Sequence, residues 1–134
     1  MSELTPKMRA FLEERRFAVL GTANTDGSPH LTVMWYILEG DEIVFNTTPS
    51  RLKHRNLRRD PRVSVMVSDG YRYLRIDGSA RAIDDRGTGQ ADIRRLAVRY
   101  EGEESAERQM RNAFSKQERV TYRVAIGHVY AGGF

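Results

Sequence analysis

The sequence predicts a mainly β fold of six antiparallel strands, closed into a small barrel and flanked by helices. Apolar and polar residues alternate with a period of two, the signature of a half-buried strand, over 29–38, 63–67, 73–83 and 120–130. Turn-forming Gly and Asp residues separate several of these stretches. A chain of 134 residues fits one domain, 1–134, and a small six-stranded sheet tends to close because closure removes its unpaired edges.

The first third of the chain is expected to form one short helix and three strands. Thr5 can cap the helix and Pro6 stands at its first position. An apolar run over 17–22 predicts the first strand, which ends at a turn. The stretches 29–38 and 42–47 are joined by a tight connection at Gly40, so we expect these two strands to pair as a hairpin.

The remaining elements follow from capping residues and from spacing. A short basic helix is predicted over 51–59, capped by Ser50 and stopped by Asp60 and Pro61. Two strands come next, and apolar residues at helical spacing then predict two further helices within 93–114. The last strand is expected over 120–130. This arrangement gives six strands, with helices inserted at three places.

Composition narrows the chemistry that the protein can perform. The chain has no cysteine, which excludes disulfides, thiol catalysis and thiolate metal sites. His30, His54 and His128 are too scattered for a metal-ligand motif. No apolar run is long enough for a membrane helix and the first residues lack a signal-peptide core, so a cytoplasmic protein is expected. A net charge of +4 favours an anionic partner.

The strongest chemical signal is the passage from the strand that ends at Thr47 into the basic helix. The first N–H groups of a helix lack intrahelical acceptors, and together with the helix dipole they favour a phosphate. Arg51 offers a planar fork for phosphate oxygens, and Lys53 offers a point charge. The alternative interpretation is a solvated basic helix. The charge pattern alone does not choose between these two interpretations.

A second, weaker signal is the alternating stretch from His30 to Trp35. A flat tricyclic ring could lie along such a strand, although an alternating strand with a Trp is more often part of a core or an interface. No paired acids and no Ser/His/Asp arrangement can be identified, so no catalytic residue is assigned. This lack suits an enzyme whose cofactor performs the difficult chemistry.

Several motifs resemble one known superfamily over nearly the whole chain. The most specific is the stretch from Asn56 to Arg62, Asn-Leu-Arg-Arg-Asp-Pro-Arg, and the segments 19–22, 26–30 and 128–130 agree with it. They resemble the pyridoxamine-phosphate-oxidase-like superfamily, whose fold is the FMN-binding split β-barrel. Within it, the chain is similar to the flavin and deazaflavin oxidoreductases that use coenzyme F420.

The resemblance implies a cofactor site at the interface of a homodimer. Arg51 and Lys53 match the pair of residues that binds phosphate. The partner subunit is expected to close the ring pocket with aromatic residues, and Tyr71 and Tyr73 hold the matching positions. The expected ring-binding residues lie on two strands: His30, Leu31, Thr32, Val33, Met34 and Trp35 on the first, and Phe45 and Asn46 on the second.

The chain departs from the vitamin-processing oxidases of the superfamily. Leu52 separates the Arg from the Lys, where those enzymes have no intervening residue, and their C-terminal Trp and Arg segment is missing. The expected function is therefore hydride transfer between F420 and an unsaturated small molecule. An FMN-binding relative and a non-enzymatic flavin or haem binder remain alternatives. A nucleic-acid partner is not expected, because the cations cluster at one helix start instead of forming a long track.

Overall fold

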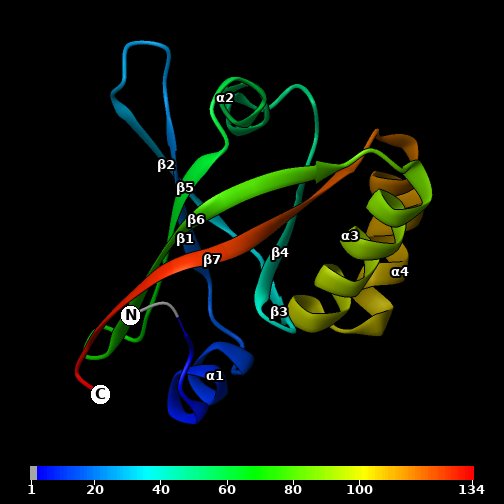
Figure 1. Cartoon of the computed structure of the whole chain (residues 1–134). Coiled ribbons are helices and arrows are strands. Elements are labelled where there is room, and N and C mark those ends of the chain that lie inside the picture. Colours follow the sequence, from blue (N-terminus) through cyan, green and yellow to red (C-terminus); the bar gives the residue numbers. More distant parts are fainter. Residues whose placement is uncertain (1–2) are drawn as a thin grey trace.

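A computed structural model describes residues 3–134 as one antiparallel sheet with four α-helices (Figure 1). The mainly β class is confirmed, but the sheet has seven strands in the order β2-β1-β5-β6-β7-β4-β3, so the expected count of six was wrong. The strands are β1 (Ala18–Ala23), β2 (Pro29–Met34), β3 (Ile37–Glu39), β4 (Glu42–Thr47), β5 (Arg62–Ser68), β6 (Tyr73–Ile83) and β7 (Val120–Gly132).

The extra strand arises because the stretch 29–38 divides into two. Its first part, β2, pairs with β1, and its second part, β3, pairs with β4. The expected hairpin around Gly40 is therefore confirmed for β3 and β4, but the expected pairing of His30–Trp35 with β4 was wrong. The two halves lie at opposite edges of the sheet. The sheet must curl for the two residues between them to join these edges, and the result is a split barrel.

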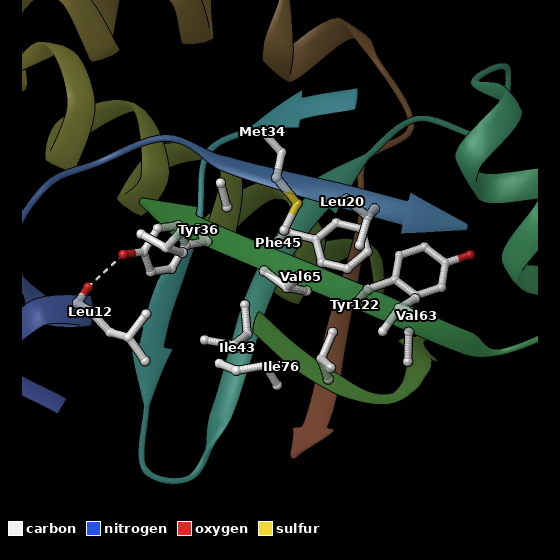
Figure 2. Packing of buried hydrophobic residues seen from close by; sticks show 14 of the residues in the cluster. Leu12, Leu20, Met34, Tyr36, Ile43, Phe45, Val63, Val65, Ile76 and Tyr122 are labelled. Atoms are coloured by element: carbon white, nitrogen blue, oxygen red, sulfur yellow. Dashed lines mark hydrogen bonds between the residues drawn. The ribbon is translucent and has the colours of Figure 1, made fainter. Parts of the chain in front are cut away.

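Tyr36 holds the chain at this division. Its backbone N–H donates to the hydroxyl of Tyr100 at 3.2 Å, and its own hydroxyl donates to the carbonyl of Leu12 at 2.7 Å (Figure 2). Its side chain is fully buried. The first contact occupies a backbone N–H that a continuous strand would have used for pairing, and the second anchors the side chain to α1. Residues from two distant helices thus interrupt a pattern that alternates without a break in the sequence.

The core fills the concave side of the sheet. Leu20, Met34, Phe45 and Tyr122 converge there from four different strands (Figure 2). Helix α1 (Pro6–Glu13) closes one end of the core with the apolar face expected from the sequence, Met8, Phe11 and Leu12. Thr5 caps α1 and Pro6 begins it, as expected.

The other helices lie at the side and at one end of the sheet (Figure 1). Helix α2 (Leu52–Arg59) ends before Pro61 as expected, but Ser50 does not cap it. The cap position is Arg51, whose carbonyl accepts from His54, while the Ser50 hydroxyl lies 3.0 Å from that of Thr48. Helices α3 (Arg86–Glu101) and α4 (Glu103–Asn112) and the short 3₁₀ turn Phe114–Lys116 form the insertion before β7. No helix in residues 3–134 is long and apolar enough to cross a membrane.

Candidate functional site

A groove of about 290 Å³ lies where the ends of β2 and β4 meet the start of α2 and the helical insertion. Its lining comes from segments far apart in the sequence, and no Asp or Glu of residues 3–134 belongs to it. The groove has a cationic part and an apolar part. The lining residues are Phe17, Val33, Met34, Trp35, Asn46, Thr47, Thr48, Arg51, Lys53, Ile93, Leu96, Phe114 and Arg119.

Three cations occupy the polar part: Arg51, Lys53 and Arg119. Within the part of the chain that the structure describes, none of them forms an ion pair with a carboxylate. Lys53 is only 5% exposed. Burial, reinforced by the positive charges of Arg51 and Arg119, lowers the pKa of Lys53 from 10.5 to about 8. A buried ammonium group without a counter-ion is costly, so this part of the groove is suited to an anion.

The start of α2 adds polar groups to the same place. The N–H groups of a first helical turn have no intrahelical acceptor, and the dipole of the helix favours negative charge there. The end of β4 leads into this turn, which brings Thr47 and Thr48 to the groove. Side-chain cations and a helix N-terminus therefore converge on one point, the combination by which proteins hold phosphate groups.

Aromatic and aliphatic side chains form the rest of the groove. Trp35 stacks on Tyr100 with ring centroids 5.3 Å apart, and Phe17 stacks on the same tyrosine at 5.5 Å. Leu96 and Phe114 come from the helical insertion. The Tyr100 ring is buried and orients Trp35 and Phe17, two of the three aromatic residues that line the groove. An apolar wall of this kind suits a flat ring system.

The structure brings together half of the residues expected from the sequence. Six of them line the groove: Val33, Met34, Trp35, Asn46, Arg51 and Lys53. Phe45 does not, because its side chain is fully buried and stacks on Tyr122 inside the barrel. Leu31 points outward and is 65% exposed, while the buried hydroxyl of Thr32 has no hydrogen-bond partner among residues 3–134. His30 pairs with Thr22 in the β1–β2 ladder, away from the groove lining.

Tyr71 and Tyr73 also lie outside the groove. They belong to the β5–β6 turn and the start of β6, and Tyr71 is 82% exposed. Neither is among the residues that line the groove of their own chain. Their expected contribution to the groove of a partner subunit stays a prediction.

Sequence reasoning missed the groove residues that arrive from outside the two strands and α2. Arg119 is the most consequential, and Phe17, Ile93, Leu96 and Phe114 were assigned no role in a site. Nothing in the local pattern around Arg119 distinguishes it from the other arginines of a basic chain. Its place in the groove depends on how the helical insertion packs against the sheet.

The convex face of the sheet carries a second hollow of about 610 Å³. Leu31 and Gly21 lie side by side at its rim. Beside it, Val33, Val19 and Met66 form a row across β2, β1 and β5. All three of these apolar side chains are exposed, Val33 by 67%. A contiguous exposed apolar face is typical of a surface that binds another protein.

A family model and several solved structures are similar to this chain. A family model described as pyridoxamine 5'-phosphate oxidase matches residues 4–131. A conserved hypothetical protein from Mycobacterium tuberculosis is similar at a TM-score of 0.81 and 28% identity, over 97% of this chain and 85% of that one. An F420 reductase is similar at 0.76 and 26%, over 95% and 98%. A haem storage protein from Vibrio cholerae shares the fold at 0.74 and 18%, over 98% and 96%.

Proposed function

The chain belongs to the pyridoxamine 5'-phosphate oxidase family, and from this premise we propose that it is an oxidoreductase dependent on coenzyme F420. Hydride would pass between the deazaflavin and an unsaturated small molecule. The observation that carries the proposal is the groove itself, in which three cations without carboxylate partners stand beside an aromatic wall. One structure with the same fold is an F420 reductase, which supports the choice of cofactor.

The residues of the groove fit a phosphorylated flavin-type cofactor. Arg51 and Lys53 would hold the phosphate at the start of α2, where an anion relieves the repulsion among the cations. Trp35, Val33 and Phe114 would border the ring and keep water from it. When bound, the deazaflavin supplies the hydride chemistry. The protein contributes binding and orientation.

The proton that accompanies hydride transfer must come from outside this groove's own side chains. Its lining holds no Asp, Glu, His, Cys or Tyr, and Lys53 and the arginines are assigned to the anion. Water is therefore one source. The partner subunit's Tyr71 and Tyr73 are the other source, if they cover the ring as the family resemblance implies.

A homodimer is part of the proposal because the groove and the apolar convex face share a residue. Val33 lines the groove and also belongs to the exposed row with Val19 and Met66. A second copy seated on this face would therefore border the groove. It would also bury the side chain of Leu31, which contributes little hydrophobic stabilisation while it is exposed in a monomer.

Light scattering at micromolar concentration tests the dimer. The unmodified protein should be dimeric, and Leu31→Glu should dissociate it because a carboxylate would be buried in the interface. Leu52→Glu is the matched control, since Leu52 is an exposed leucine on α2 outside the convex face. A monomer that binds cofactor as tightly as any dimer would overturn the shared site.

The choice between F420 and FMN rests on the protein cations that could attract the part of F420 beyond its phosphate. Arg55 and Arg59 extend along α2 and pair with no carboxylate in residues 3–134, whereas Arg58 pairs with Asp84 at 3.1 Å. F420 continues past its phosphate into a carboxylate-bearing tail that these cations can attract. FMN ends at the phosphate and gains nothing from them.

Titration with each cofactor over a range of salt concentrations tests this choice. F420 should bind more tightly than FMN at low salt, and the gap should narrow as the Debye length falls below about 8 Å. Replacing Arg55 and Arg59 by Met should remove most of the extra salt dependence that F420 binding shows over FMN binding, and should leave the salt dependence of FMN binding unchanged. FMN binding that is equal or tighter at every salt concentration would replace F420 by FMN in the proposal.

A further inference from the structure

Arg119 lies at the polar end of the groove although it follows α2 by sixty residues in the sequence. It stands directly before β7 and lines the groove together with Arg51 and Lys53. We infer that Arg119 is a third ligand of the cofactor's phosphate group and that Asn46 is the residue that positions it. The inference rests on the proposed function and extends it to a residue from the far end of the chain.

Uncharged partners hold the Arg119 side chain in place. Its Nε donates to Oδ1 of Asn46 at 2.8 Å, and Nη1 donates to Oε1 of Gln117 at 2.9 Å. The guanidinium carbon lies 5.1 Å from the centre of the Phe114 ring. These contacts fix the plane of the guanidinium group. In residues 3–134 no acceptor engages Nη2, so that nitrogen remains available to a ligand.

The backbone around Arg119 is fixed as firmly as its side chain. A Cβ atom on Gly89 of α3 would lie 1.9 Å from the carbonyl oxygen of Arg119, so only glycine permits this approach. The Asn46 side chain also donates to the carbonyl of Gly89 at 2.9 Å. One asparagine therefore links β4, α3 and the residue that precedes β7. This junction is how the helical insertion reaches the anion site.

The hydrogen-bond partners of Arg119 carry no charge, and this feature indicates an anion site. Several half-buried arginines here are matched by acids, as Arg95 is by Asp92 at 2.8 Å, whereas Arg99 donates to backbone carbonyls only. Asn46 and Gln117 orient Arg119 without cancelling its charge. Burial, and then the nearby Arg51, lowers the pKa of Arg119 to about 10. A bound phosphate would supply the missing counter-charge.

Binding of two pairs of ligands to an Arg119→Met variant tests the assignment. The pairs are FMN against riboflavin, which differ by the phosphate alone, and F420 against its deazaflavin fragment, which lacks both the phosphate and the carboxylate-bearing tail. Arg119→Met should weaken binding of the phosphorylated member roughly 10- to 100-fold, the loss typical of a hydrogen-bonded charge contact. Binding of the member without phosphate should not change. Arg111→Met, an exposed arginine at the end of α4, is the control for lost charge and should bind both members normally.

Two further measurements separate a ligand from a merely structural residue. Removing the positive charge of Arg119 should raise the pKa of Lys53 in the unliganded protein, measurable by NMR of the lysine side chain. Asn46→Asp would place a carboxylate on Arg119 and should weaken phosphate binding. That effect should disappear when Arg119 is already Met. Arg119→Lys keeps the charge and should recover part of the affinity.

The outcomes distinguish this inference from the function on which it rests. A native protein that binds neither FMN nor F420 overturns both. A native protein that binds, with an Arg119→Met variant that binds equally well, overturns only the role of Arg119. Equal losses for the ligands with and without phosphate would likewise overturn it, because the residue would then act through the fold.

Discussion

Two clusters of cations in this protein differ in how their charge is balanced. The paired cluster consists of Arg81, Arg95 and Arg123 with Glu39, Glu42 and Asp92, and it lies on β3, β4, β6, β7 and α3. The groove cations are Arg51, Lys53 and Arg119. In the paired cluster, Arg123 reaches Glu39 at 2.8 Å and Glu42 at 2.9 Å, and Arg95 reaches Glu39 at 2.7 Å. The groove cations have no such partners in residues 3–134.

The pKa values of the cations shift in opposite directions in the two clusters. Hydrogen bonds from Arg81 and Arg123 lower the pKa of Glu42 to about 2, and those same bonds raise the pKa values of the two arginines. In the groove, burial and mutual repulsion lower the pKa of Lys53 to about 8. The paired cluster therefore stabilises the fold, whereas the groove cations cost stability until an anion binds. This difference in charge balance identifies the groove as a binding site. The number of positive charges alone would not distinguish the two clusters.

The largest expected effect comes from replacing Lys53. Lys53→Met should weaken binding of the phosphorylated cofactor by about 1–3 kcal/mol, because a hydrogen bond to a charged group is lost. The free energy of unfolding of the unliganded protein should not fall, because the variant removes a buried, unpaired charge. Calorimetric titration and urea unfolding measure the two quantities. Unchanged affinity would remove Lys53 from the anion site.

The pH dependence of cofactor binding is the next largest effect. Lys53 attracts the phosphate only when protonated, so affinity should be constant below pH 8 and should fall above it, by at most about tenfold per pH unit. Binding near pH 8.5 should also take up protons, because the anion raises the pKa of the lysine. Calorimetry in two buffers of different ionisation enthalpy measures this uptake. The Lys53→Met variant should show neither effect, and a sloping profile in that variant would assign the titration to another group.

The paired cluster should give the smallest effect, and that effect should be on stability alone. Glu42→Gln should lower the free energy of unfolding by about 0.5–1 kcal/mol at pH 7, the range for a half-exposed ion pair. The pKa of Glu42 is lowered on folding from 4.5 to about 2, so its stabilisation is complete above pH 4.5 and is lost as pH falls toward 2. The free energies of unfolding of the unmodified protein and of Glu42→Gln should therefore converge at low pH. A change in cofactor affinity would contradict the separation of the clusters.

The sequence alone determined the features that depend on neighbouring residues. Period-two alternation located β5, β6 and β7, and Thr5 and Pro6 located the start of α1. The stretch 56–62 identified the family, and the order of Arg51 and Lys53 after a strand identified two of the three groove cations. Each of these features is encoded within about a dozen residues, where spacing and backbone chemistry act directly.

Only the tertiary structure decided the features that join distant segments. The stretch 29–38 alternates without interruption, yet contacts of Tyr36 with Tyr100 and Leu12 divide it between the two edges of the sheet. Arg119 enters the groove because Gly89 lets α3 approach its backbone and Asn46 holds its side chain. These partners lie from 24 to 73 positions apart in the sequence. Local spacing carries no information about packing over such separations, so neither feature could be predicted before the chain was folded.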